Sequence, residues 1–188
     1  MHPRARGVAV GLHYRTRMPG YSSASSEPLS EFRVEKSRAT ATLTLLNGTA
    51  VHGCFFISGN SRTHPGPESV RDLLNSESGF FPFDTGPSED SATVLYNRDH
   101  LVFVEIQDKN EPARDPGYDV AIEKLVTILM SNGMRLRGAV RVFRPHGSDR
   151  LSDFARAQET FRYLEAENAT YIINVHHVVE LAEEPRVL

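Results

Sequence analysis

The chain has 188 residues, of which 39% are hydrophobic and 24% are charged, and its formal net charge is −3. This composition is ordinary for one globular domain or two small ones. No apolar run approaches the ~20 residues that a membrane-spanning helix needs, and no apolar segment follows the N-terminal arginines as a secretory signal requires. Cys54 is the only cysteine, which excludes an intramolecular disulfide and multi-cysteine metal sites and favours a cytoplasmic location.

Charge is distributed unevenly along the chain. Residues 1–38 hold seven Lys/Arg against three Asp/Glu, so the remaining 150 residues carry 14 against 21. The leader is rich in Ser and Pro and lacks hydrophobic periodicity, which predicts a flexible tail with a short element near 32–34. This basic tail could touch an anionic partner, whereas the acidic remainder argues against a broad nucleic-acid surface.

Two hairpin signals indicate an internal repeat. Asn47-Gly48 and Asn132-Gly133 each lie between alternating apolar runs, a pattern that predicts two strands joined by a type I′ turn. Gly53 and Gly138 occupy the same point of the second strand, where glycine indicates a sharp bend. The positions expected to face inward also correspond: Ala41, Leu43 and Leu45 with Val126, Ile128 and Met130, and Val51, Phe55 and Ile57 with Leu136, Val140 and Val142.

The repeat continues beyond these hairpins. Segments 69–75 and 150–156 predict short helices with Ser or Asp near their starts, and short aromatic strands follow at 80–83 and 161–164. Each copy ends with an apolar run, an Asn, two residues, a His and a second apolar run, which predicts strand, tight turn, strand. The matching pairs are Asn97 with Asn174 and His100 with His177.

Each copy therefore predicts strand, strand, helix, strand, strand, strand. The expected fold is mainly β, with two tandem five-stranded small barrels that each carry a short helix after the second strand. A single continuous barrel or sandwich with internal pseudo-symmetry is the alternative. The predicted organisation is a flexible tail at 1–38, a first barrel at 39–107, a linker at 108–119, a second barrel at 120–183 and a tail at 184–188.

The bent second strands carry a family resemblance. Segments 43–53 and 128–138 follow the pattern h-x-h-x-x-G-x-x-h-x-G, in which h is hydrophobic, and this resembles bacterial Sm-like or SH3-like small barrels. The tandem arrangement with Val-Arg-Asp-Leu-Leu-Asn is similar to an uncharacterised group of bacterial proteins. Sm-like barrels commonly pair edge strands into rings, so the resemblance implies oligomers. The RNA-binding loop pattern of Sm proteins is missing after Ile57 and in both Asn-x-x-His segments, so the resemblance does not carry over a uridine pocket.

Candidate catalytic and metal-binding residues are few. His100 and His177 recur, but each copy supplies one such His without H-x-x-x-H spacing, so we expect turn histidines that hydrogen-bond backbone groups. Asp72 and Asp153 match the preference of helix N-termini for carboxylates. No nucleotide-binding glycine loop or serine-hydrolase motif occurs. We therefore expect no enzyme activity, catalytic residue, cofactor or metal.

Two surfaces are candidates for binding. Cys54, Phe56, Leu101 and Phe103 are expected on an apolar outer face of the first barrel, which would contact the sister barrel, a protein partner or another copy of the chain. Arg135, Arg137 and Arg141 alternate along one strand and predict an anion-binding stripe on the second barrel. The alternative for the stripe is a solvated face paired with Glu165, Glu167 or the acidic C-terminus.

These observations favour a non-enzymatic, cytoplasmic interaction or scaffolding module that binds a protein partner or self-associates. The second hypothesis is an RNA-binding or other anion-binding protein that uses the arginine stripe and the basic leader.

Overall fold

The structure is a computed structural model that describes residues 36–61, 64–86, 92–142 and 151–185. These residues belong to one compact unit, 34–188. The element expected near 32–34, and almost all of the basic leader, lie outside the described residues.

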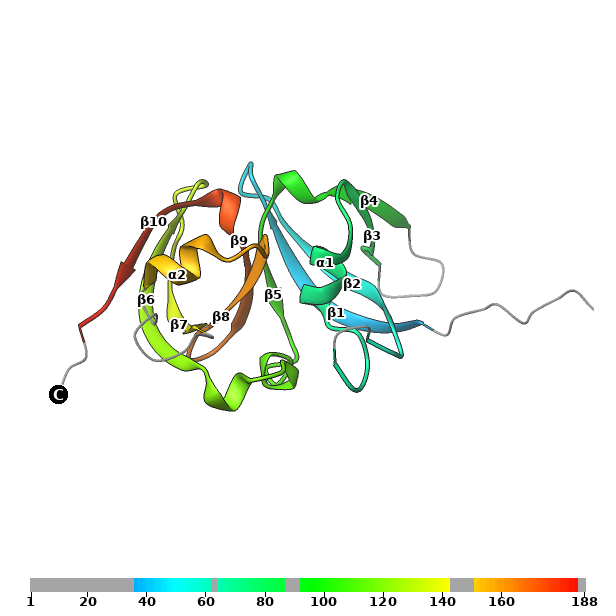
Figure 1. The fold of residues 1–188 in the computed structure, drawn as a ribbon. Helices are drawn as coiled ribbons and strands as arrows, with labels where there is room; N and C mark the ends of the chain where they lie inside the picture. The colour runs from blue at the N-terminus through cyan, green and yellow to red at the C-terminus, as the bar shows by residue number, and fades with distance from the viewer. Residues whose placement is uncertain (1–35, 62–63, 87–91, 143–150, 186–188) are drawn as a thin grey trace, which may run out of the picture. The chain divides into compact units, whose positions relative to one another are not determined.

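Ten strands and two α-helices follow one another in the described part of the chain (Figure 1). The strands of the first half are β1 (Lys36–Leu45), β2 (Ala50–Ser58), β3 (Phe80–Asp84), β4 (Thr93–Asn97) and β5 (Leu101–Ile106). Those of the second half are β6 (Ile122–Met130), β7 (Arg135–Val142), β8 (Phe161–Glu165), β9 (Thr170–Asn174) and β10 (Val178–Glu183). The helices are α1 (Val70–Ser76) and α2 (Leu151–Arg156), and 3-10 turns lie at η1 (Arg98–His100), η2 (Pro112–Arg114), η3 (Tyr118–Val120) and η4 (Val175–His177).

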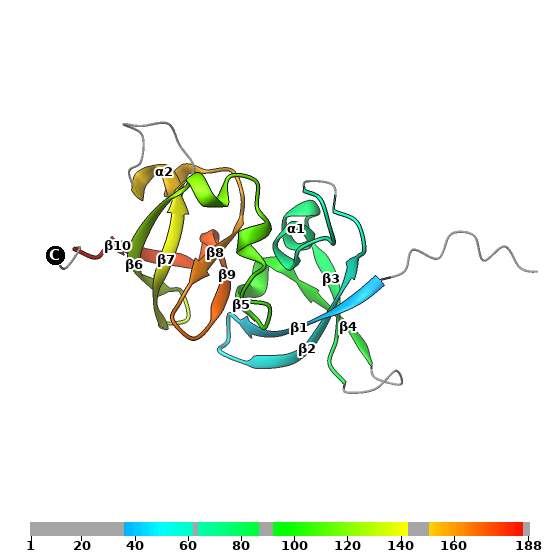
Figure 2. The ribbon, with the colours of Figure 1, turned by 90° about the horizontal axis from the view of Figure 1, so that it is seen from below.

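The strands form one antiparallel sheet in the order β10-β6-β7-β8-β9-β5-β1-β2-β3-β4. The two halves therefore repeat the same internal order, and β9 of the second half pairs with β5 of the first half. The expectation of a mainly β fold is confirmed, but two separate closed barrels are not, because the ten-stranded sheet is not closed. Figures 1 and 2 show β10 and β4 at opposite ends of this arrangement.

The expected inward positions of the hairpin strands form the cores. Leu43, Phe55, Ile128 and Val140 are fully buried, because alternate residues of a bent strand face the same side. Each half has its own hydrophobic cluster, yet each cluster also takes residues from the other half. The first-half cluster includes Phe161, Tyr163 and Ile172, and the second-half cluster includes Val102 and Phe103.

The Asn-Gly turns differ from the expected type I′. Leu45 pairs with Thr49 through a 2.9 Å backbone hydrogen bond, so the connection has three residues. Gly48 and Gly133 have φ values of 82° and 85°, and no other residue type in the described ranges has positive φ. The asparagines instead accept a hydrogen bond from the backbone N–H two residues later. One glycine per turn is enough for a three-residue hairpin loop, so the sequence signal located the hairpins but not their turn type.

The Asn-x-x-His segments do not form the expected hairpins. Each lies in a 3-10 turn whose N-cap is the Asn, with its side chain accepting from the N–H two residues on. β4 pairs with β3, whereas β5 pairs with β1, so the strands on either side of η1 do not pair with each other. The second half repeats this arrangement at η4, because β9 pairs with β8 and β10 pairs with β6. The motif therefore marks a corner between two parts of the sheet.

Gly53 and Gly138 permit a close approach of neighbouring strands in each half. A Cβ at Gly138 would lie 2.7 Å from the backbone oxygen of Glu165, and a Cβ at Gly53 would clash still more closely with the backbone oxygen of Asp84. Backbone atoms cannot move aside as a flexible side chain can. The glycines are therefore required where β2 meets β3 and where β7 meets β8.

Replacement of these glycines tests this packing. We expect Gly53→Ala and Gly138→Ala each to lower the free energy of unfolding by about 2–4 kcal/mol in urea titrations, because overpacking against backbone forces the strands apart. Gly59→Ala is the control, since a Cβ there meets nothing within 4 Å. Equal stability of all three variants would contradict the account.

Candidate functional site

The junction between the halves is the pairing of β5 with β9. Phe103 lies opposite Ile173 and Val104 opposite Ile172. Phe103 also packs edge-on against Tyr171, with the two ring centroids 5.5 Å apart. The junction therefore combines a strand ladder with apolar side chains on both sides of the sheet, which links the two hydrophobic clusters.

The second Asn-x-x-His motif ties this junction together. The buried Asn174 donates from Nδ2 to the backbone oxygens of Arg98 and Leu101, at 3.3 and 2.9 Å. His177 donates from Nε2 to the backbone oxygen of Asp99 at 2.8 Å. Both side chains therefore satisfy backbone groups of the other half.

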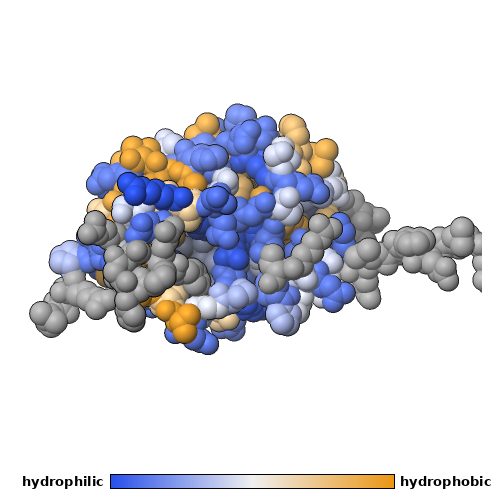
Figure 3. Space-filling model, viewed as in Figure 1, coloured by the Kyte–Doolittle hydropathy of each residue, from blue (hydrophilic) through white to orange (hydrophobic). Residues whose placement is uncertain are grey.

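β4 and β10 are the two ends of the described sheet, because each pairs with one strand only. They are the counterparts of β9 and β5, the strands that meet at the junction. Figure 3 shows hydrophobic side chains at the surface near both ends. The large hydrophobic residues exposed there include Phe80 on β3, Leu95 on β4 and Val179 on β10.

The four residues expected on an apolar outer face do not form one surface. Leu101 is buried in the first-half cluster, and Phe103 is buried in the second-half cluster. The reason is a register shift, since Thr44 pairs with Phe103 and Leu45 with Leu101, which leaves Val102 as an extra residue. Cys54 and Phe56 lie partly exposed on β2. Alternation therefore failed for Leu101 at the bulge, whereas Phe103 faces the second half, one of the contacts expected for this face.

The arginines of the expected anion-binding stripe lie next to carboxylates. Arg137 makes a bidentate contact with Glu184, at 2.8 Å from Nε to Oε1 and 2.5 Å from Nη2 to Oε2. Arg141 lies 2.8 Å from Glu165, and Arg135 lies 3.7 Å from Glu180. These partners neutralise the stripe locally, so an incoming anion would compete with resident carboxylates.

The segment between the halves is packed against both of them. Glu111 is buried, and its Oε1 accepts hydrogen bonds from the Val70 and Arg71 N–H groups at the start of α1, at 3.1 and 3.4 Å. The Tyr163 hydroxyl of β8 donates to the same oxygen at 2.8 Å. Burial raises the pKa of the Glu111 carboxyl. One carboxylate thus joins the connecting segment to both halves.

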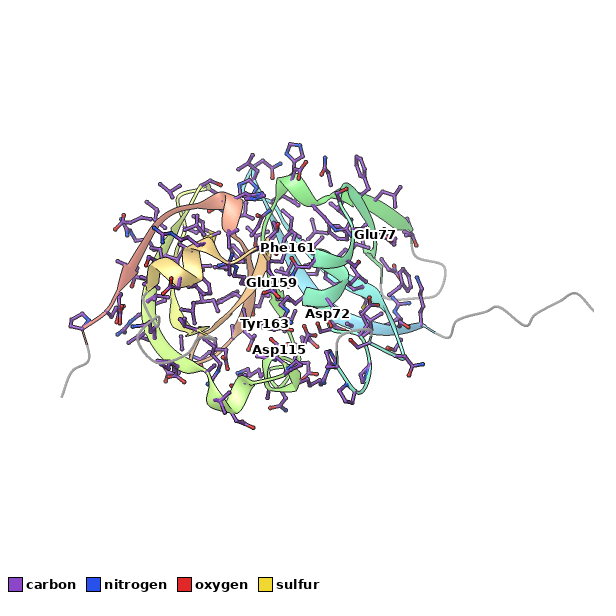
Figure 4. All side chains as sticks on the ribbon, viewed as in Figure 1. Asp72, Glu77, Asp115, Glu159, Phe161 and Tyr163 are labelled. Atoms are coloured by element: carbon purple, nitrogen blue, oxygen red, sulfur yellow. The ribbon has the colours of Figure 1, made fainter. Side chains whose placement is uncertain are left out.

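A second contact fixes α1 against β8. The Asn75 side chain donates to the backbone oxygen of Phe161 at 2.9 Å and accepts from its N–H at 3.0 Å. The Asn75 amide therefore pairs with both backbone polar groups of Phe161 in β8, as a residue of a neighbouring strand would. Figure 4 shows Phe161, Glu159, Tyr163 and Asp115 in the region where α1 approaches β8.

A cavity with a volume of about 180 Å³ opens beside these contacts. Its floor and walls combine the connecting segment, α1, α2 and β8. The residues that define its chemistry are Arg71, Asp115, Tyr118, Phe154, Arg162 and Tyr163. The sequence analysis missed this site because its members are distant in the chain and share no motif.

Cation–π contacts hold the cavity arginines in place. The Arg71 guanidinium lies 4.9 Å from the ring centroid of Tyr163, and the Arg162 guanidinium lies 4.9 Å from that of Phe154. Arg71 also forms an ion pair with Asp115. Stacked guanidinium groups keep their edges available for hydrogen bonds while their faces are covered.

Asp115 is the most perturbed carboxyl of the cavity. Burial raises the pKa of Asp115 from 3.8 to about 6, although the Arg71 guanidinium opposes this shift. The folded state therefore holds the Asp115 proton more tightly than the unfolded state does. The contribution of this group to stability is fully present below about pH 4 and is lost as the pH rises through about 6.

The Asp115→Asn variant tests this linkage. We expect the free energy of unfolding of the wild type, relative to that of the variant, to fall by up to about 3 kcal/mol between pH 4 and pH 7. Urea titrations at four pH values would measure it, with Asp108→Asn as the control that removes an exposed carboxylate of the same segment. A difference that stays constant or grows with pH would refute the assignment.

Comparison with known proteins gives no family assignment: no family model, curated protein or solved structure matches the chain. In the described ranges, no group of three or more His, Cys, Asp or Glu side chains could hold a metal ion. No described helix is long and apolar enough to cross a membrane. Function must therefore be inferred from the sheet edges and the cavity.

Proposed function

We propose that this chain is a non-enzymatic, cytoplasmic interaction module that self-associates head to tail, with β10 of one copy pairing with β4 of the next. The observation that carries the proposal is the junction inside the chain, where the counterparts of these two strands already pair. We also propose that each half is an Sm/SH3-like small barrel. The association between copies would then repeat the contact that joins the two halves within one chain.

Burial of corresponding residues supports the proposal. Ile172 of β9 is 0% exposed at the junction, whereas its counterpart Leu95 of β4 is 63% exposed. Phe161 is buried beside β9, while its counterpart Phe80 is exposed beside β4. These apolar side chains thus lie at positions where a second strand would cover them.

The other edge carries the complementary feature. Val102 is the bulge residue of β5 and is 0% exposed, because it inserts into the cluster of the second half. Val179 occupies the same bulge position in β10 and is 65% exposed. A second copy on this edge would cover Val179 as the second half covers Val102.

The junction also fixes the expected register between copies. Val104 opposite Ile172 becomes Leu181 opposite Leu95, and Phe103 opposite Ile173 becomes Glu180 opposite Tyr96. The Asn97 amide would reach backbone oxygens of the neighbouring copy, as Asn174 reaches those of Arg98 and Leu101. The edges contain more polar residues than the junction, so we expect reversible association. Such a contact is heterologous and gives a ring or an open chain of copies.

The alternative of RNA or anion binding is less well supported. The Arg135, Arg137 and Arg141 side chains already face carboxylates, and any phosphate would have to displace them. The head-to-tail proposal needs no such displacement. We therefore place self-association first.

Edge variants test the proposal. We expect wild-type protein at micromolar concentration to show, by light scattering, a mass that is a multiple of the 21.0 kDa chain. Leu95→Asp and Val179→Asp should each give monomers, because a buried unpaired carboxylate at a strand edge opposes pairing. Val120→Asp is the control, since Val120 is exposed in η3, away from both edges. A monomeric wild type would overturn the proposal.

Mixing the two edge variants distinguishes the orientation. The Leu95→Asp chain retains an intact β10 edge and the Val179→Asp chain an intact β4 edge, so an equimolar mixture should contain a dimer with one copy of each. If β4 instead paired with β4, or β10 with β10, one variant would still dimerise by itself. That result would refute head-to-tail association.

A further inference from the structure

The two Asn-Gly turns place the same labile chemical group in two different surroundings. An asparagine side chain loses ammonia when the backbone nitrogen of the next residue attacks its carbonyl carbon, and asparagine is accordingly among the thermolabile residues. A following glycine leaves that nitrogen unshielded, because glycine has no Cβ. The chain contains two Asn-Gly pairs, Asn47-Gly48 and Asn132-Gly133. The structure shows which of them is more open to this reaction.

Both loops share the same local hydrogen bonds. The glycine N–H donates to a backbone carbonyl oxygen of the preceding strand, at 2.8 Å for Gly48 and 2.9 Å for Gly133. The asparagine Oδ1 accepts from the backbone N–H two residues later, at 3.0 Å for Asn47 and 3.1 Å for Asn132. These bonds occupy the nitrogen that attacks and the oxygen of the group that is attacked, so each loop must open before it reacts. A difference in reactivity between the two asparagines must therefore come from other contacts.

Ser131 anchors the second loop through its side chain. Its Oγ donates to His177 Nδ1 at 2.9 Å, and His177 Nε2 in turn donates to the backbone oxygen of Asp99 at 2.8 Å. Leu46 stands at the corresponding position of the first loop, and its side chain cannot form hydrogen bonds. The backbone N–H of each residue bonds to the histidine of its own half, so only the side chains differ. Opening the second loop breaks one more hydrogen bond, which corresponds to a difference of about five-fold in the population of opened loop.

Access to solvent differs in the same direction. Asn47 is exposed, whereas Asn132 is half-buried and its Nδ2 atom is buried. Nδ2 is the atom that leaves as ammonia, and it must take up a proton from water to do so. Burial of this atom therefore protects Asn132, and the exposure of Asn47 leaves its amide open to the reaction.

We infer that Asn47 is a site of spontaneous deamidation and that Asn132 is its protected counterpart. The Gly48 nitrogen forms a bond to Asn47 Cγ and gives up its proton, and the Cγ–Nδ2 bond breaks with release of ammonia. Water then opens the resulting cyclic imide at either carbonyl carbon, which leaves aspartate or isoaspartate at position 47. Water is the only co-reactant, and no group is oxidised or reduced. The reaction takes place within a single chain and does not depend on the self-association proposed above.

The products change both charge and backbone at the tip of the β1–β2 hairpin. The new carboxylate would lie in the surface pocket that Asn47 lines together with Leu45, Leu46 and His100. Isoaspartate also routes the backbone through the side-chain carbon and so lengthens the loop. The three-residue loop is closed by the 2.9 Å hydrogen bond from the Leu45 N–H to the Thr49 oxygen, and a longer backbone path does not fit that closure.

Mass spectrometry of tryptic peptides, after incubation of the full chain in mildly alkaline buffer, tests the inference. Peptide 39–62 reports the conversion of Asn47, and peptide 125–135 reports that of Asn132. We expect Asn47 to convert at least about five-fold faster than Asn132 in the folded protein. In concentrated urea both loops are open, so the two asparagines should convert at similar rates. If Asn132 converts as fast as Asn47 in the folded chain, or if Asn47 stays intact while the urea sample reacts, the inference is wrong.

A serine variant assigns the protection to the anchored loop. Ser131→Ala removes the hydrogen bond to His177, and we expect it to raise the conversion rate of Asn132 about five-fold. Asn47 in the same molecule should keep its wild-type rate, and Ser78→Ala, at an exposed serine outside both loops, should change neither rate. Circular dichroism establishes that each variant is folded, and the comparison within the wild type retains its force if one is not. An unchanged Asn132 rate in folded Ser131→Ala would overturn the anchoring of this loop by Ser131.

Discussion

The pairing of β5 with β9 is the interaction on which the rest of the structure depends. It merges two five-stranded halves into one sheet and brings Val102 into the core of the second half and Ile172 into that of the first. Because each cluster is completed by residues from the other side, neither half presents a finished hydrophobic core by itself. The repeat in the sequence therefore corresponds to a repeated strand order, whereas the hydrophobic core needs both halves of the chain.

The same constraint accounts for both candidate sites. A head-to-tail contact between two similar halves uses β5 of the first half and β9 of the second half. The corresponding edge strands, β10 of the second half and β4 of the first half, are left unpaired at the two ends of the sheet. The junction also draws α1 of the first half against β8 of the second half, and the buried Glu111 joins them to the connecting segment. The cavity lies where these three elements meet, so the sheet edges and the cavity have one structural origin.

Much of the local fold could be predicted from the sequence. Alternating apolar residues identified the buried faces of β1, β2, β6 and β7, and the glycines at 53 and 138 marked real close approaches because only hydrogen fits there. Prediction failed where geometry depends on distant partners. The bulge at Val102 exchanged the expected faces of Leu101 and Val102, and the corner at Asn97 replaced an expected hairpin. The cavity gave no sequence signal, because Arg71, Asp115 and Arg162 meet only through the fold.

Hydrogen–deuterium exchange at low and high protein concentration tests the central claim most directly. The account predicts that backbone amides of β5 and β9 are protected at both concentrations, because they pair within one chain, and that those of β4 and β10 gain protection together as the concentration rises. The result that would contradict it is concentration-dependent protection elsewhere in the chain with β4 and β10 unchanged, or exchange in β5 and β9 as rapid as in the two open edges.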